Sequence, residues 1–387
     1  MKNIAIVSKS LKNGGAERAA ANLSKDLSDK YNVFIFLFDA SDISYPYSGT
    51  IVDLRFADYK GLIGKIRFLS RLRQIKKEKL IDISISFMPQ LNLYNVLSRN
   101  GDKCITSIRN TMSVSSMNLV DRIGMLFCAK KADCTVSLSE GAREDLIKNF
   151  HYDERRTITI YNSCDRSWFM RESPEVDELI KGFDFSCPVL STAGRLTFAK
   201  GQWHLLRAFS IVVKQIPNCR LVIFGKGDYE EKLKEYAIEL GIDKNVLFMG
   251  YVKNHHKFLE KCTAFVFPSI YEGLGNVLLE ALACGLPTIS SNCLNGPSEI
   301  LEGKVHHPLN KVSYCEYGIL VPEFSYKEFD VKDKEFENSD RMMAEAIIRL
   351  LTDQGLKEDY NRRALLRIKD FAPEKIKGQW YKLLDNI

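Results

Sequence analysis

The sequence predicts an α/β protein made of two doubly wound, Rossmann-like domains. Its 387 residues exceed what one ordinary hydrophobic core needs and suit two domains of fewer than two hundred residues each. Short runs rich in β-branched residues alternate with helical stretches along the whole chain, which is typical of parallel sheets. This alternation stops at a poorly periodic stretch in the middle of the chain and then begins again.

The first half contains six runs that we interpret as strands. They are residues 3–8, 32–38, 82–87, 104–109, 134–139 and 157–162, and the first helix is expected over 17–29. The irregular stretch from 165 to 188 carries Pro174 and Pro188, so we expect a linker near 166–187. The N-terminal domain is therefore predicted over 1–168.

The second half repeats the pattern. Strands are expected at 189–195, 219–225, 245–250, 264–268 and 286–292, with helices from Gly201 and over 229–240. A second domain is predicted over 188–370, followed by a C-terminal helix at 371–387 that returns to the N-terminal domain. Residues 323–340 are strongly charged and weakly apolar, which favours a surface excursion.

The composition is that of an ordinary water-soluble protein, with 45% apolar and 27% charged residues. The first apolar run is too short for a signal segment, and no run is long enough to span a bilayer. The ten cysteines form no C-x-x-C pair, so we expect a reduced cytosolic protein with neither zinc nor disulfides. The basic excess lies in the first 170 residues, which carry +8 against −2 for the remainder.

The motif SIYEGLGNVLLEALACGLP at 269–287 is the most informative segment. It follows an expected strand, and Gly273 and Gly275 precede a helix that begins near Asn276. Glycines allow close backbone approach to a ligand, and unpaired N–H groups in a first helical turn favour an anion. Carboxylates such as Glu272 and Glu280 do not suit a phosphate, but they can accept hydrogen bonds from the vicinal hydroxyls of a ribose or sugar. The alternative is that Glu280 is a solvent-facing helical residue.

Two further strand-to-helix turns carry glycines or cations. Arg195 and Lys200, in AGRLTFAKG, can converge on one diphosphate, although both could be solvated surface cations. Gly14 and Gly15, in NGGAER, follow the first strand and could equally be ordinary turn residues.

Residues 60–80 carry eight cations and a single acid, Glu78. Apolar residues recur at helical spacing, namely Leu62, Ile63, Ile66, Leu69, Leu72 and Ile75. One interpretation is a helix whose apolar face joins the core and whose basic face is solvated. The other is docking on an anionic membrane surface, as a polyprenyl-linked acceptor would require.

The setting PSIYEGLGNVLLEALACG resembles the signature of glycosyltransferase family 4, whose members have the GT-B fold with two Rossmann-like domains facing across a cleft. NGGAER, AGRLTFAKG, FGKGD, GYV and YGILVP fit the family in order. The resemblance implies a retaining, metal-independent transfer of a hexosyl or N-acetylhexosaminyl unit from a UDP-linked sugar. The N-terminal elements are most similar to bacterial enzymes of lipid-linked oligosaccharide, capsule or O-antigen assembly, so a glycan or polyprenyl-linked glycan acceptor is implied.

The resemblance also implies roles for individual residues. Arg195, Lys200, Glu272 and Arg109 are the implied catalytic groups, with Arg195 and Lys200 on the donor diphosphate. The implied donor-binding residues are Gly14, Gly15, Gly225, Tyr251, Val252, Gly273, Gly275, Asn276, Val277 and Glu280. Many members carry a histidine where this chain has Arg109, which we therefore expect to hold the diphosphate, the sugar or an acidic acceptor group. The alternative is an arginine paired with a carboxylate at the domain edge.

Several classes of site are not expected. The chain has no D-x-D motif, no P-loop and no nucleic-acid-binding architecture, and we expect neither metal nor cofactor. His255-His256 and His306-His307 are interpreted as surface residues. The expected location is cytoplasmic, peripheral on the inner face of the cytoplasmic membrane. The alternatives to a transferase are a nucleotide-sugar epimerase, a phosphorylase with a lysine-bound cofactor, and an inactive binding subunit.

Overall fold

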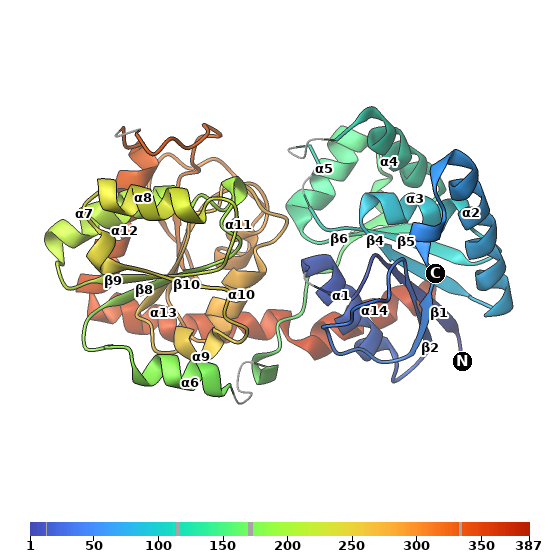
Figure 1. Cartoon of the computed structure of the whole chain (residues 1–387), viewed down its shortest axis with the longest axis horizontal. Coiled ribbons are helices and arrows are strands. Elements are labelled where there is room, and N and C mark those ends of the chain that lie inside the picture. The colour runs from blue at the N-terminus through green and yellow to red at the C-terminus, as the bar shows by residue number, and fades with distance from the viewer. Residues whose placement is uncertain (13, 111, 114–116, 169–172, 333–334) are drawn as a thin grey trace. The chain divides into compact units, whose positions relative to one another are not determined.

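The structure is a computed structural model that describes residues 1–12, 14–110, 112–113, 117–168, 173–332 and 335–387. The chain forms two compact units (Figure 1). The first comprises Met1–Asn162 together with Pro373–Ile387, and the second comprises Ser163–Ala372. The predicted class, two Rossmann-like α/β units, is confirmed.

The first unit is built on a seven-stranded parallel sheet in the order β3-β2-β1-β4-β5-β6-β7. Its strands are β1 Asn3–Ser8, β2 Asn32–Leu37, β3 Thr50–Asp53, β4 Ile83–Phe87, β5 Lys103–Ile108, β6 Cys134–Ser137 and β7 Thr157–Thr159. The central strands are buried on both faces, as parallel sheets require. The sequence pattern did not reveal β3, a short and half-exposed edge strand.

Helices cover both faces of this sheet. They are α1 Gly15–Leu27, α2 Gly61–Glu78, α3 Pro89–Leu97, α4 Leu119–Lys131 and α5 Glu140–Phe150. The last helix of the chain, α14 Pro373–Asn386, packs beside α1, and both share one apolar core with the sheet. Residues of α2 and α3 form a separate core on the opposite face.

The second unit has a seven-stranded sheet in the order β10-β9-β8-β11-β12-β14-β13, parallel except for β13. Its strands are β8 Val189–Ala193, β9 Arg220–Phe224, β10 Val246–Gly250, β11 Ala264–Phe267, β12 Thr288–Ser291, β13 Ser313–Tyr314 and β14 Ile319–Val321. The order reverses between β8 and β11, because β9 follows β8 on one side and β11 lies on the other. Ligands of doubly wound sheets bind beyond the carboxyl ends of strands at such a reversal.

The helices of the second unit are α6 Pro174–Lys181, α7 Gln202–Gln215, α8 Glu230–Glu239, α9 His256–Leu259, α10 Asn276–Ala283, α11 Pro297–Leu301, α12 Asn338–Thr352 and α13 Gln354–Arg367. Helix α7 packs on α8 and α12, whereas α10 packs on α9, α11 and α13. The stretch where we expected a linker contains α6, which packs on α9. No helix among the described residues is long and apolar enough to cross a membrane.

Most described residues of the charged segment at 323–340 are exposed, as expected of a surface excursion, but two of its aromatic side chains are buried. Phe324 and Phe329 are buried in the core of the second unit. The Phe324 ring stacks on His204 at 4.0 Å between centroids, and the Phe329 ring stacks on Trp203 at 5.3 Å. Two aromatic anchors in an otherwise charged run are enough to attach it to α7.

Candidate functional site

The carboxyl edge of the second sheet brings together four predicted site segments. The loop after β8 carries Arg195 and ends in a short 3-10 helix, Phe198–Lys200. The loop after β11 carries Glu272 and leads into α10. Since β8 and β11 are neighbours at the point of reversal, these two loops meet, and the Ile270 N–H donates to the Ala199 carbonyl at 2.9 Å.

Lys200 and Glu272 form an ion pair where these loops meet. Both side chains are largely buried, with 21% of Lys200 and 10% of Glu272 exposed. The Ser269 hydroxyl donates to the same Glu272 oxygen at 2.9 Å, and the Lys200 ammonium also lies 5.6 Å from the centre of the Phe267 ring. The alternative that Lys200 is a solvated surface cation is therefore wrong.

Arg195 is placed differently from Lys200. Its side chain is exposed and makes no ion pair with the residues that the structure describes, while its carbonyl accepts from the Gln202 side chain at 3.1 Å. Of the two cations, only Lys200 is paired with a carboxylate of the described residues, so their convergence on one diphosphate stays a prediction. An exposed guanidinium next to an anchored ammonium is still free to turn toward an anion.

Helix α10 begins at the carboxyl edge, as the motif predicts. Gly275 is its N-cap and has φ +90°, a left-handed conformation that favours glycine. Gly273 and Gly275 are buried, whereas Asn276 and Val277 are partly exposed in the first turn. This turn presents backbone N–H groups and the positive end of the helix dipole beside Lys200 and Glu272, an arrangement suited to an anion.

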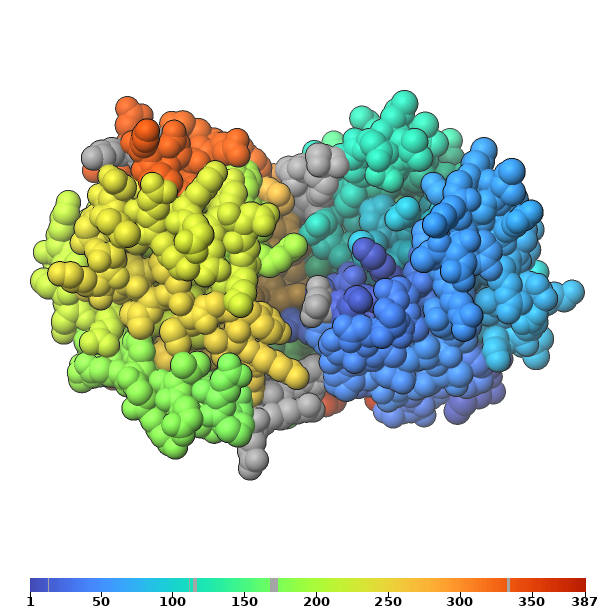
Figure 2. Space-filling view, in the orientation of Figure 1, coloured from blue at the N-terminus to red at the C-terminus, as the bar shows by residue number. Residues whose placement is uncertain are grey.

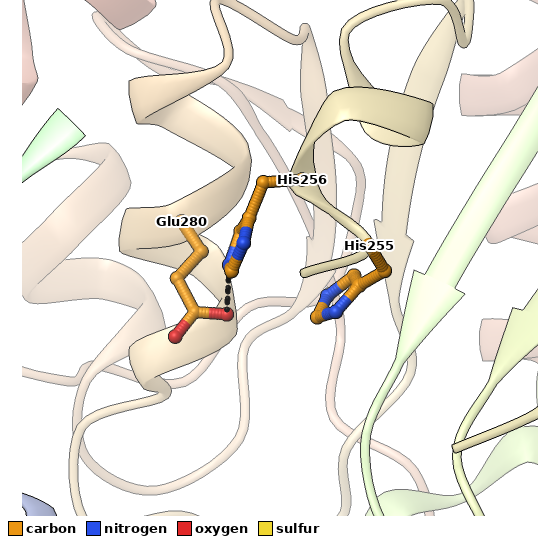
Figure 3. A group of neighbouring side chains, drawn as sticks. All are labelled: His255, His256 and Glu280. Atoms are coloured by element: carbon orange, nitrogen blue, oxygen red, sulfur yellow. Dashed lines mark hydrogen bonds and ion pairs between the residues drawn. The ribbon is translucent and has the colours of Figure 1, made fainter. Parts of the chain in front are cut away.

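Glu280 lies further along α10 and is only 5% exposed, so the alternative of a solvent-facing residue is wrong. Its Oε2 lies 3.2 Å from Nε2 of His256, the first residue of α9 (Figure 3). The interpretation of His255-His256 as surface residues is therefore also wrong for His256, whose side chain is 12% exposed. Nothing in the local sequence indicates this contact, because 24 residues separate the partners.

His255 points into the same space as His256 and Glu280 (Figure 3). One ligand atom from each of the three side chains lies within 4.8 Å of the others. Two imidazoles and one carboxylate are groups that Zn²⁺ accepts. The sequence reasoning missed this set, because it looked for partners at fixed spacing.

The loops after β8, β9 and β10 approach one another closely through glycines. The Gly225 N–H donates to the Gly250 carbonyl at 2.7 Å, and a Cβ on Gly225 would lie 1.8 Å from the Gly194 carbonyl oxygen. No larger residue fits at Gly225. Two predicted donor-binding residues follow Gly250 in the chain: Tyr251 is 70% exposed, and Val252 is 6% exposed.

The remaining predicted residues belong to the first unit. Gly14 is the N-cap of α1 and Gly15 its first residue, whereas Asn13 of the same motif lies outside the described residues. Arg109 follows β5, stacks on Phe87 at 4.7 Å and donates through Nη1 to Asn162 Oδ1 at 2.8 Å. No carboxylate of the described residues pairs with it, so the alternative of an edge ion pair is not supported.

Burial lowers the pKa of Arg109 to about 9, so its guanidinium remains positively charged at neutral pH. Its Nε is buried and has no hydrogen-bond partner among the described residues. A buried donor without a partner costs free energy, of order 1–3 kcal/mol. Arg109 therefore has an unused donor that an anionic or polyhydroxyl ligand can satisfy.

Comparison with known proteins agrees with this architecture. The model "Glycosyltransferase Family 4" matches residues 13–168, and "Glycosyl transferases group 1" matches residues 181–316. An uncharacterised glycosyltransferase of Methanocaldococcus jannaschii is 31% identical over 342 residues, which are 84% of each chain. An N-acetylgalactosaminyltransferase of Campylobacter jejuni, named for an N-acetylgalactosamine-N,N'-diacetylbacillosaminyl-diphospho-undecaprenol acceptor, is 27% identical over 99% of this chain and 100% of its own.

Solved structures show the same fold. The Anabaena protein HepE in complex with UDP superposes with a TM-score of 0.80 at 17% identity, over 100% of both chains. The lipopolysaccharide glycosyltransferase WaaG gives a TM-score of 0.70 at 15% identity, over 97% of this chain and 98% of its own.

Proposed function

Because this chain belongs to the family 4 glycosyltransferases, we propose that it transfers a hexosyl or N-acetylhexosaminyl unit from a UDP-linked donor. The observation that carries this proposal is the meeting of Lys200, Glu272 and the first turn of α10 at the reversal of the second sheet. An anion-binding turn next to buried carboxylates suits a ligand that has both phosphates and hydroxyls. A structural relative, HepE, has been solved with UDP and with UDP-glucose.

The donor diphosphate is assigned to Lys200, Arg195 and the first turn of α10. The Lys200 ammonium has three N–H donors, so it can retain its contact with Glu272 and still donate to a phosphate oxygen. Glu280 is assigned to the ribose hydroxyls, and the glycine-rich loops at Gly225 and at Tyr251–Val252 to the base. Glu272 is then assigned to the transferred sugar.

The proposed reaction retains the anomeric configuration and needs no metal. The bond between the anomeric carbon and the diphosphate oxygen breaks, and the acceptor oxygen bonds to that carbon on the same face. The departing diphosphate takes the acceptor's proton, so no enzyme nucleophile is required. Catalysis then consists of positioning and of stabilising charge on the leaving group, with on the order of 3–4 kcal/mol from each well-placed donor.

The proposed acceptor is a glycan or a polyprenyl-linked glycan. Two Campylobacter jejuni relatives are named for undecaprenol-linked acceptors, and each covers almost the whole chain. We also propose that the first unit docks on an anionic membrane surface, which would place the enzyme on the inner face of the cytoplasmic membrane. The support is that α2 exposes Leu62, Ile63 and Ile66 among its cations.

Free-nucleotide release on a panel of nucleotide sugars, with and without glycan acceptors, tests this function. We expect acceptor-dependent release of UDP with one hexosyl or N-acetylhexosaminyl donor. Conversion of the sugar without an acceptor would indicate an epimerase, and activity that requires phosphate and a lysine-bound cofactor would indicate a phosphorylase. Nucleotide binding without turnover on the whole panel would favour an inactive subunit. The anomeric proton coupling of the product tests retention, and activity after chelation tests metal independence.

A further inference from the structure

We propose that His256 is a positioning residue for the donor site. It holds the Glu280 carboxylate in the orientation in which this group accepts hydrogen bonds from the ribose hydroxyls. This inference rests on the proposed function of Glu280. Its structural basis is the 3.2 Å contact between His256 Nε2 and Glu280 Oε2, made between two side chains that are 12% and 7% exposed (Figure 3).

The His256 ring is held on both sides. Its Nδ1 lies 3.2 Å from Oδ1 of Asn254, a residue with φ +121° in the loop between β10 and α9. The charged imidazolium donates to both oxygens, whereas the neutral ring donates to Glu280 when the Asn254 amide turns its nitrogen toward Nδ1. The proposal requires the states in which His256 Nε2 carries a proton and donates it to the carboxylate.

The contact between His256 and Glu280 would favour ligand binding because it restricts the rotation of the carboxylate. The last torsion of a glutamate side chain is broad, so an unsupported carboxylate samples many orientations. A ligand that needs one orientation must order that group when it binds, which weakens the complex. A carboxylate held by an imidazole is already ordered, and the benefit is confined to ligands that use Glu280.

The same loop connects two parts of the proposed nucleotide site. Tyr251 and Val252 are assigned to the base, and His256 follows four residues after Val252. His256 therefore connects the loop after β10 with the Glu280 carboxylate. Correct placement of this loop also orients the carboxylate that is assigned to the ribose.

A divalent cation is the rival occupant of this cluster. His255, His256 and Glu280 offer ligand atoms within 4.8 Å of one another. A bound cation would require both histidines and would use the carboxylate itself. The two explanations therefore differ in the role of His255 and in their response to chelation.

The test is titration of three ligands into the full-length protein after treatment with EDTA. The ligands are UDP, 2'-deoxy-UDP and 2',3'-dideoxy-UDP. The variants are His256→Ala, His256→Gln, Glu280→Ala, His255→Ala and the double variant His256→Ala/Glu280→Ala. His307→Ala is the matched control, since His307 Nε2 also lies 3.5 Å from a carboxylate, that of Glu302.

We expect His256→Ala to weaken UDP about tenfold, the size of one hydrogen bond to a charged group. The dideoxy nucleotide should lose less than about twofold, because it has no ribose hydroxyls for Glu280 to bind. The double variant should bind UDP no worse than Glu280→Ala, since coupled residues are not additive. His256→Gln, which also places an N–H donor near the carboxylate, should recover part of the affinity, and His255→Ala and His307→Ala should resemble wild type.

Equal losses for UDP and dideoxy-UDP, or additive losses in the double variant, would overturn the role of His256. Wild-type affinity in Glu280→Ala would instead remove the ribose role of Glu280, and absence of UDP binding by wild type would refute the donor proposal itself. Binding of Zn²⁺ that depends on both histidines and changes UDP affinity would overturn positioning in favour of a cation site. Thermal unfolding of each variant excludes misfolding, with His256→Gln as the variant least disturbed in volume.

Discussion

Lys200 stands out among single residues because its charge is compensated before any ligand arrives. The ammonium pairs with Glu272 and lies near the Phe267 ring, with about a fifth of the side chain exposed. A cation held in this way costs little reorganisation when negative charge develops nearby, which is the condition for electrostatic catalysis. Its contribution should therefore appear in turnover more than in donor affinity.

Lys200→Ala is expected to lower kcat about a hundredfold or more, with a smaller change in the KM for the donor. Steady-state kinetics with the best donor of the panel measure both constants. Lys214→Ala removes an exposed cation in the last turn of α7 and is the control. A rise in KM at constant kcat would make Lys200 a ground-state anchor instead.

Arg109 stands where the family resemblance leads us to expect a histidine. Because burial lowers its pKa only to about 9, it is a hydrogen-bond donor and not a general base at neutral pH. Its contacts are with Phe87 and the Asn162 amide, which leaves its charge uncompensated by any carboxylate of the described residues. We expect it to act on an anionic or hydroxyl-bearing substrate group.

Three substitutions separate charge from geometry at this position. Arg109→Ala and Arg109→His should lose most activity, and Arg109→Lys should recover only part, since an ammonium lacks the planar fork. The measurement is kcat/KM for donor and acceptor, with thermal unfolding to confirm that each variant folds. Full activity in Arg109→Ala would refute a role in the reaction.

At the scale of elements, α2 is amphipathic over only part of its length. Phe68, Leu72 and Ile75 are buried, but Leu62 and Ile63 are 77% and 69% exposed. The expected single apolar face is therefore divided between the core and the surface of the first unit. Helix α2 itself lies on the outside of that unit (Figure 1), in a blue region of the space-filling view (Figure 2). Seven of the eight cations at 60–80 are exposed, while Lys76 is buried and pairs with Asp102 at 2.8 Å.

Helix α4 exposes a second apolar set in its first turns. Leu119, Val120 and Ile123 are between 57% and 73% exposed. Helix α3 contacts α4 and shares a core with α2, so all three helices lie on the same face of the sheet. Exposed apolar residues next to cations are typical of a surface that lies on anionic lipid.

Vesicle sedimentation tests this surface. Wild type should bind vesicles that contain phosphatidylglycerol at low salt and dissociate as ionic strength rises, because screening shortens the attraction. The variant Leu62→Ser/Ile63→Ser should bind more weakly without loss of thermal stability, since both residues are already exposed. Ile238→Ser, a 65% exposed residue of α8, is the control. Equal binding to neutral vesicles, or none to either, would contradict the proposal.

At the scale of the whole molecule, the two ends of the chain meet in the first unit. Ile376, Trp380 and Leu384 of α14 are buried in the core that α1 shares with the sheet. Tyr381 donates to the Asp26 carbonyl at 2.9 Å, and Lys30 pairs with Asp385 at 2.6 Å. The first unit is thus completed only after the second has been synthesised.

This junction should make stability depend on pH. Desolvation raises the pKa of Asp26 on α1 to about 6, despite the nearby Lys377. Since the folded pKa exceeds the unfolded value of 3.8, folding favours the protonated form. The contribution of Asp26 to stability is therefore fully present below about pH 4 and is lost as pH rises through about 6.

Asp26→Asn should accordingly be more stable than wild type above pH 6, by roughly 1–2 kcal/mol after allowance for partial exposure. The difference should vanish near pH 4. Chemical denaturation of both proteins at several pH values measures it. A difference that stays constant with pH would show that Asp26 titrates normally in the folded chain.

The order of most helices and strands, and the place of each motif at a carboxyl edge, were predictable from the sequence. Alternation of apolar and polar residues is local, and so are the glycines that allow the turns before α7 and α10. The segment 269–287 therefore predicted Glu272 and Glu280 as candidate site residues, together with the helix between β11 and β12. Strands β3, β13 and β14 were missed, because each has only two to four residues, too few to carry a clear period.

Only the tertiary structure decided which side chains meet. Lys200 reaches Glu272 across 72 residues, because β8 and β11 become neighbours in the sheet. Glu280 reaches His256 because α9 and α10 pack together, and Phe329 is buried because Trp203 lies opposite it. Such contacts depend on strand order and helix packing, which bring together residues whose local patterns carry no information about each other. Local periodicity determines the elements, and long-range packing determines the chemistry between them.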